Sequence, residues 1–248
     1  MNTRLIAAAL LVSAIGFAQP SAYKPPEGPA PKTPWGKPDF NGVWARPYAP
    51  DVTRSGGGQV GAGELPYTEW GKKQWDNYKP EQDGDYTGSC LPFGHMRSIG
   101  SPDPMQIMQT PDNQMAFLFE QNSWFQVFPI DGRKHDNRVA SWFGNSVGHW
   151  DGDTLVIETI NFNGLTRLDT AGHPHSDQLK LTEKLTRTDA GHIAYEVIVD
   201  DPKTYTKPWS NKRTFTLRTD WTILEYSCEE NNKSFIEGRI KMPKYDAK

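Results

Sequence analysis

From Met105 onward, apolar and polar residues alternate with a period of two, the pattern of strands that bury one face. The pattern predicts at least eight strands, drawn from 105–109, 114–121, 123–130, 146–150, 154–162, 178–187, 193–200, 212–218 and 221–228. The segments Asp151-Gly152-Asp153, 188–191 and 219–220 have the composition of tight turns, and therefore predict hairpins.

Successive hairpins without helical crossovers indicate an antiparallel sheet. So many strands in one domain have to close into a barrel or stack as a β-sandwich, because either arrangement hides the sheet edges. We therefore expect an all-β fold, with a barrel resembling the lipocalin type as the first choice and a sandwich as the alternative. No repeat with the period of a propeller or solenoid is visible.

The first part of the chain has a different organisation. Residues 1–18 combine Arg4, a short apolar run and small residues at 16 and 18, which is typical of a secretory signal peptide. The run is too short to span a membrane, so we predict an exported chain, periplasmic or secreted, without an integral membrane segment. Residues 19–39 are Pro-rich and predict an extended lead, and residues 40–248 form a single β-rich domain.

Within that domain, 41–44 predicts a first short strand. Residues 68–78 predict one short surface helix, with Trp75 and Tyr78 on one side and Pro80 after its end.

Composition agrees with many strands joined by turns, because the 248 residues include 22 Gly and 20 Pro and are 12% aromatic. The net charge of -3 gives no electrostatic reason to expect a nucleic-acid partner. Exactly two cysteines, Cys90 and Cys228, in an exported chain predict a disulfide. Two unpaired buried thiols are the alternative.

Two well-known motifs occur in the wrong context. Gly56-x-Gly58-x-x-Gly61 matches the dinucleotide fingerprint, but no apolar strand precedes it and no long helix follows, so we expect no nucleotide cofactor. Gly144-x-Ser146-x-Gly148 matches the nucleophile elbow, yet a hairpin follows where the elbow needs a helix. Asp169 and His173 follow in the order of a catalytic triad, which keeps a serine hydrolase as a minor alternative.

His173-Pro174-His175 is a candidate metal site, because histidines at i and i+2 in an extended segment project to the same side. Asp169 and Asp177 flank the pair closely. A divalent metal needs at least one further ligand, for which His149 is the candidate. A solvated turn stabilised by polar side chains is the competing interpretation.

Glu183 shares a predicted strand face with Leu179, Leu181 and Leu185, so its carboxylate is expected to point inward. An inward carboxylate needs a partner or a catalytic role. Pairing with Arg187 is the structural interpretation, and a general acid or base is the functional one. Glu158 has a similar setting between Val156 and Ile160, but either strand could turn its polar face inward.

Several aromatic residues could line a ligand cavity, although aromatic side chains also fill small barrels as core. The candidates are Trp124, Trp142, Trp150, Tyr205 and Trp209.

The segments 90–94, 108–112, 146–156, 172–176, 201–205 and 225–231 together resemble a family of exported, uncharacterised bacterial proteins. This resemblance implies a periplasmic or secreted protein and carries over no activity.

Three functions follow from these patterns. The first is a barrel that binds a small apolar or aromatic molecule near His149, Asp169, His173, His175 and Glu183. The second is an enzyme, either a metal-assisted hydrolase or lyase or an acid-base isomerase, using the same cluster. The third is a structural or assembly partner in the periplasm.

Overall fold

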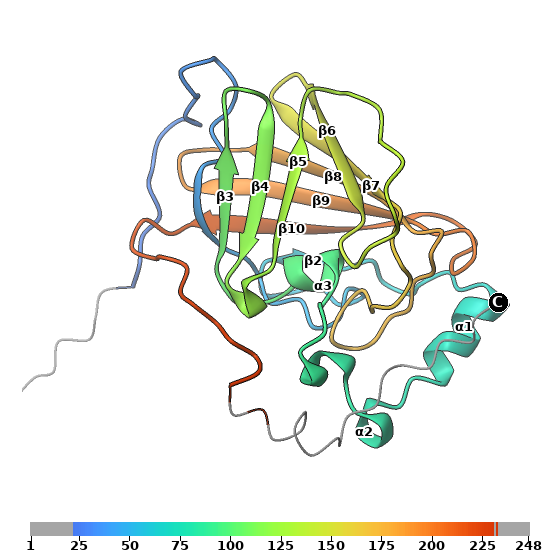
Figure 1. The fold of residues 1–248 in the computed structure, drawn as a ribbon. Coiled ribbons are helices and arrows are strands. Elements are labelled where there is room, and N and C mark those ends of the chain that lie inside the picture. Colours follow the sequence, from blue (N-terminus) through green and yellow to red (C-terminus); the bar gives the residue numbers. More distant parts are fainter. Residues whose placement is uncertain (1–21, 231, 233–248) are drawn as a thin grey trace, which may run out of the picture.

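The computed structural model describes residues 22–230 and 232. In this part of the chain, nine strands form an antiparallel, nearly closed barrel in the order β5-β4-β3-β1-β10-β9-β8-β7-β6 (Figure 1). The two-residue β2 pairs with β10 outside this order. The bounds are β1 Gly42–Ala45, β2 Gln59–Val60, β3 Met105–Gln109, β4 Gln114–Phe119, β5 Phe125–Pro129, β6 Asn145–Asp151, β7 Thr154–Ile160, β8 Lys180–Arg187, β9 His192–Asp200 and β10 Trp209–Leu217.

The predicted all-β class, the antiparallel barrel and most strand positions are confirmed. Asp151 pairs with Thr154, so Gly152 and Asp153 form the predicted hairpin turn, and Gly152 has the left-handed φ of 59° that such a turn requires. The strand predicted at 221–228 is wrong. Trp44 of β1 pairs with Leu217 of β10, so the edge of β10 on which a following hairpin strand would pair is already occupied.

The barrel is incomplete between β5 and β6. Gln126 bridges this gap from β5, because its amide nitrogen donates to the carbonyl of Phe143 at 3.1 Å and to the hydroxyl of Ser146 at 2.7 Å. Ser146 in turn bonds to Thr159 on β7 at 2.7 Å. These side-chain bonds join the two edges where no backbone ladder does.

The barrel interior is filled by large apolar side chains, as the alternating strand pattern requires. The β8 sequence shows this alternation, with Leu181 and Leu185 buried and Lys184 exposed. Fully buried members of the core include Trp44, Phe40, Phe117, Phe215, Met105, Ile107, Met115, Leu155 and Ile157.

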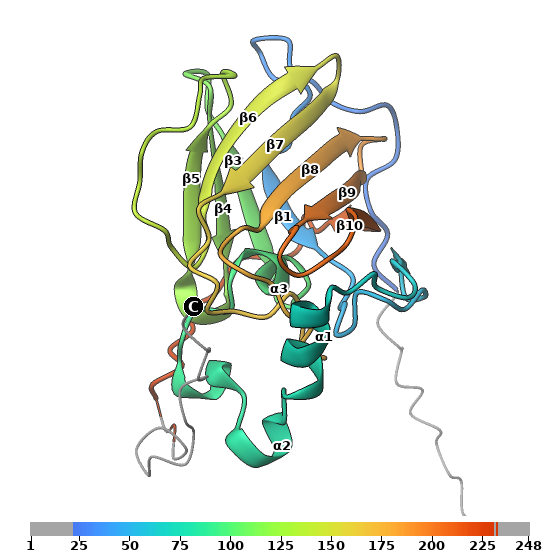
Figure 2. The same cartoon turned by 90° about the vertical axis from the view of Figure 1, so that its right-hand side faces the viewer.

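Short helices cover one end of the barrel (Figure 2). They are α1 Glu69–Asp76, α2 Pro80–Asp83 and α3 His95–Ile99, with single 3₁₀ turns at Tyr86–Ser89 and Gln121–Ser123. The predicted helix corresponds to α1, which begins after Thr68, whose hydroxyl accepts from the Gly71 amide at 3.0 Å. The sequence did not predict α3, because five residues are too few to show a helical period.

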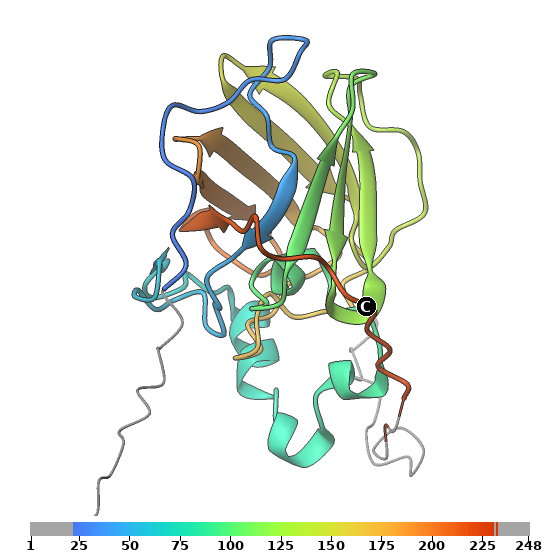
Figure 3. The ribbon, with the colours of Figure 1, turned by 90° about the vertical axis from the view of Figure 1, so that its left-hand side faces the viewer.

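The described part of the Pro-rich segment lies against the outside of the barrel (Figure 3). Residues 32–38 turn back on themselves, with a bridge between Lys32 and Pro38, so this stretch is not extended. The Tyr23 hydroxyl donates to the carbonyl of Leu217 at 2.7 Å, and the Ala190 amide donates to the carbonyl of Gly28 at 3.0 Å. The predicted signal peptide lies outside the described residues. Among the residues described, no helix has the length and apolar character needed to cross a membrane.

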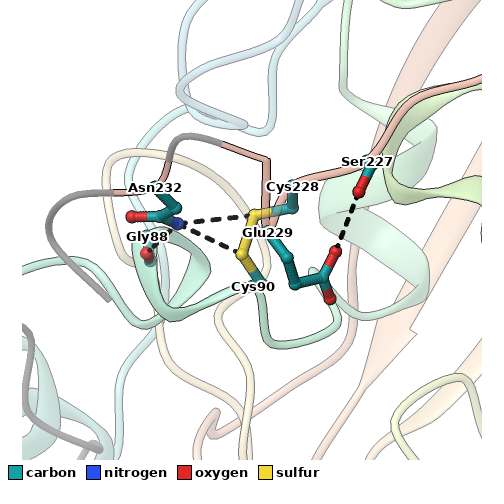
Figure 4. The surroundings of a disulfide bond; sticks show 6 residues. All are labelled: Gly88, Cys90, Ser227, Cys228, Glu229 and Asn232. Carbon is teal, nitrogen blue, oxygen red and sulfur yellow. Dashed lines mark hydrogen bonds between the residues drawn. A yellow bond between two sulfur atoms is a disulfide. The ribbon is translucent and has the colours of Figure 1, made fainter. Parts of the chain in front are cut away.

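The predicted disulfide between Cys90 and Cys228 is confirmed (Figure 4). Its Cα atoms are 5.5 Å apart, within the usual range for a disulfide. The bond joins the turn after α2 to the segment that follows β10. The side chain of Asn232 lies beside both sulfur atoms and donates to the carbonyl of Gly88 at 2.9 Å.

Candidate active site

Asp169 and His173 form a buried dyad in the loop between β7 and β8, at the barrel end that carries the helices. Nδ1 of His173 donates to Oδ2 of Asp169 at 2.6 Å. The loop closes tightly between them, because the Leu168 amide donates to the carbonyl of His173 at 2.9 Å. Asp169 is 1% exposed and His173 is 4% exposed, so the pair is shielded from water.

Every lone pair of the Asp169 carboxylate has a donor. Oδ1 accepts from the amides of Gly172 and His173 at 2.9 and 3.1 Å, and Oδ2 also accepts from the Val52 amide at 2.8 Å. Four N–H groups therefore fix this carboxylate and, through it, the tautomer and orientation of the His173 ring. Nε2 of His173 has no hydrogen-bond partner among the described residues.

Aromatic rings enclose the dyad. Trp75 of α1 stacks on the His173 ring with centroids 4.4 Å apart and planes 4° apart. Tyr67 stacks in turn on Trp75 at 6.4 Å and on Tyr205 at 5.3 Å. The Tyr205 hydroxyl donates to the carbonyl of Pro174 at 2.7 Å, which ties the aromatic cluster to the loop of the dyad.

The sequence of α1 permits this close approach. A Cβ at Gly71 would lie 2.2 Å from the carbonyl oxygen of Thr204, so only glycine lets α1 contact the loop before β10. The hydroxyl of Thr68 donates to the carbonyl of Lys203 at 2.7 Å and anchors the start of the helix there. Trp75, two turns from Thr68, is thereby held over His173.

One arrangement in the described residues could accommodate a metal ion. Candidate ligand atoms of Asp51, Asp169 and His173 lie within 4.8 Å of one another. Because four N–H groups already occupy the Asp169 carboxylate, it is suited to orienting His173 rather than to binding a cation. Burial alone would raise the pKa of Asp51, but hydrogen bonds from Thr53 and the nearby His173 and Arg54 hold it below its ordinary value.

His175 does not join His173 in that arrangement, contrary to the predicted shared metal. Its Nδ1 donates to the carbonyl of Ser176 at 2.9 Å, and its Nε2 bonds to the hydroxyl of Thr166 at 2.6 Å. The i, i+2 rule holds for a regular strand, whereas residues 168–177 form a loop. His175 is a buried structural residue with both ring nitrogens satisfied.

Burial lowers the pKa of His175, which makes the neutral ring the folded form. In the unfolded chain the ring regains an ordinary pKa of about 6.5. Below about pH 6.5, His175 therefore binds a proton in the unfolded state but not in the folded state. We expect the free energy of unfolding to fall as the pH drops from 7 to 5. Urea unfolding at several pH values measures this.

The matched variants for this pH dependence are His175→Asn and His149→Asn. We expect a shallower pH slope with His175→Asn, because the titrating ring is gone, and the parent slope with His149→Asn. An unchanged slope in His175→Asn would assign the pH dependence to other groups.

His149 lies away from this site. It is exposed on β6 and lines a pocket of about 270 Å³ together with His135, Glu158 and the loop from Gly132 to Lys134. The sequence grouped it with His173 and Asp169 because it precedes a turn, but β6 carries it onto the outer surface.

Glu183 points into the barrel as predicted and is 0% exposed. Its partners were not predicted. Oε2 lies 2.8 Å from Nε2 of His95 on α3, and Oε1 accepts from the hydroxyl of Tyr195 on β9 at 2.8 Å. Burial and the charge of Glu183 raise the pKa of Tyr195 well above its ordinary value, which keeps the phenol a hydrogen-bond donor.

The expected pairing of Glu183 with Arg187 is wrong. Arg187 donates to the carbonyls of Asp189 and Ala190, and its guanidinium lies 4.5 Å from the ring centroid of Trp44. It sits near the end of β8 that leads into the β8–β9 turn, where these carbonyls are in reach. Glu158 has the opposite orientation from Glu183. It faces outward and pairs with Lys180 at 2.6 Å.

Four of the five aromatic residues predicted to line a cavity belong to three separate contacts. Trp124 packs on Phe143 near the gap in the barrel, with ring centroids 6.2 Å apart. Trp150 packs on Phe40 at 5.9 Å. Tyr205 and Trp209 contact each other edge to face at 5.5 Å and are the two that belong to the cluster around His173. Trp142 is half-buried against the core.

Ser146 is not placed as a nucleophile. It is 3% exposed as the second residue of β6, and its hydroxyl is bonded to Thr159 and Gln126. Ser146 therefore lies on a strand that continues into a hairpin, and the helix that a nucleophile elbow needs does not follow it.

Comparison with protein-family models and with curated proteins finds no match for this chain. What the protein does is therefore inferred from the dyad and its aromatic surroundings alone.

Proposed function

We propose that this is an exported barrel protein that binds a small, partly aromatic molecule beside α1 and performs acid-base chemistry on it with His173. The observation that carries the proposal is the Asp169–His173 bond, with the carboxylate saturated and Nε2 of the imidazole without a hydrogen-bond partner among the described residues. The half-buried rings of Trp75 and Tyr67 supply apolar surface for an aromatic or apolar substrate. The proposed site therefore combines the binding function and the enzymatic function that the sequence suggested as alternatives.

Proton transfer follows from the geometry. Nε2 takes a proton from the substrate, or from a water that attacks it, and the resulting imidazolium is stabilised through Nδ1–H by the ionised Asp169. The same Nε2 then returns the proton to the leaving group or product. Asp169 acts as a positioning residue, and Trp75 further stabilises the imidazolium by its stacked π face.

Hydrolysis of p-nitrophenyl acetate, an aromatic ester that imidazoles cleave, tests the proposal. We expect the parent to release nitrophenolate faster than the reaction in buffer alone. His173→Gln should lower kcat/KM at least about 100-fold, the usual contribution of a general base. Trp75→Leu should raise KM, because it removes a stacking face from the site.

His149→Gln is the matched control, since this histidine is exposed and distant from the dyad. It should keep the parent rate. A His173→Gln variant that folds, by circular dichroism, and hydrolyses the ester as fast as the parent would refute the catalytic role. Equal losses in both variants would indicate unspecific cleavage by surface imidazoles.

A further inference from the structure

The barrel interior contains two buried guanidinium groups close to the Glu183 cluster. Arg46 is 5% exposed and Arg213 is 3% exposed. Arg46 donates from both terminal nitrogens, to the carbonyls of Ser98 and Asp103, and so caps the end of α3. Arg213 donates only from Nε, to the side-chain oxygen of Asn211 at 2.9 Å.

Both terminal amino groups of Arg213 lack an acceptor among the described residues, and so does Nε of Arg46. The two carboxylates that act on Arg213 through space, Glu183 and Asp169, cannot supply one. Glu183 is bonded to His95 and Tyr195, and the Asp169 oxygens are saturated by N–H donors. A buried charged donor without an acceptor is costly, so this edge of Arg213 requires a partner.

The electrostatic setting favours an anion as that partner. Burial and, after it, the charge of Arg213 lower the pKa of Arg46 to about 9, so the two guanidinium groups repel each other. Burial also lowers the pKa of Arg213. A negative charge beside Nη1 and Nη2 of Arg213 would offset both the cost of burying this guanidinium and its repulsion with Arg46. The two parallel N–H groups of such an edge match the two oxygens of a carboxylate.

We propose that Arg213 binds a small monoanion inside the barrel, with a carboxylate of the size of formate or acetate held by Nη1 and Nη2. The site is separate from the dyad: the Val52 amide contacts Asp169, whereas the Val52 carbonyl accepts from Asn211, so this stretch of chain lies between them. The proposal therefore does not depend on the catalytic role of His173.

The test measures the melting temperature of the full chain in Tris sulfate, with formate, acetate or chloride added at constant ionic strength. We expect formate to raise the melting temperature saturably, by about 5 to 10 °C at 100 times its Kd. Arg213→Gln should abolish this rise. Arg133→Gln, at an exposed arginine paired with Asp131, should keep it.

Equilibrium dialysis of the parent with radiolabelled formate tests the site independently of any variant, and we expect one formate bound per chain. A rise with chloride equal to that with formate would show that the site does not select carboxylates and would overturn the proposed bidentate recognition. No rise with any anion, together with no bound formate, would overturn the proposal and leave water as the partner of Arg213.

Discussion

Replacing Glu183 by leucine is expected to lower the free energy of unfolding by about 2 to 6 kcal/mol, because two buried groups lose their acceptor at a cost of about 1 to 3 kcal/mol each. The carboxylate is fully buried, and both its oxygens hold side chains from other elements, His95 from α3 and Tyr195 from β9. Leucine leaves both partners without an acceptor and removes one of the two carboxylates, Glu183 and Asp169, whose charges act on Arg213. Denaturant unfolding followed by fluorescence measures the loss.

Two further variants show whether the charge or the hydrogen bonds carry this effect. Glu183→Gln keeps an oxygen for the Tyr195 hydroxyl and should cost less than Glu183→Leu. Glu158→Leu is the matched control, because Glu158 occupies the corresponding place in β7 but pairs with Lys180 at the surface. Exposed pairs contribute at most about 1 kcal/mol, so this variant should stay close to the parent. Equal losses for Glu158→Leu and Glu183→Leu would contradict the buried network.

These two glutamates show how far sequence reasoning reaches in this protein. Both interrupt an apolar alternation, and the period of two correctly predicted that Glu183 shares a face with Leu181 and Leu185. The period cannot say which face of β7 is inside, because Val156 is buried as well as Leu155 and Ile157. The barrel itself followed from local signals, namely alternation, turns and the absence of crossover helices.

The partners of the site residues could not be predicted in the same way. His95 lies 88 positions from Glu183 in the sequence, on a helix too short to show a pattern. Asp169 and His173 were candidates because they are close in sequence, and the structure joins them. Trp75 was placed on one side of the predicted helix, but its contact with His173 depends on how α1 packs against Thr204. Long-range packing decides such contacts.

Removing the disulfide is the second change with a large expected effect. Cys90 and Cys228 are 138 positions apart, and the loop they close contains every strand from β3 to β10. In the chain-entropy model, a cross-link over a loop of this length destabilises the unfolded state by about 4 to 5 kcal/mol. We expect the double variant Cys90→Ser/Cys228→Ser to lose up to this amount of unfolding free energy in urea.

The position of the disulfide outside the strands determines which part of the folded structure its removal affects. No strand contains Cys228, and the segment after β10 contacts the barrel through single bonds, such as the Leu224 amide to the Glu120 carboxylate at 2.8 Å. The folded barrel should therefore survive reduction with its strand ladders intact, while its unfolding midpoint shifts. Reductant should shift the midpoint of the parent and leave that of the double variant unchanged. If the parent and the double variant unfold at the same urea concentration without reductant, the cross-link contributes nothing, and the interior packing and the Glu183 network alone determine the stability of the barrel.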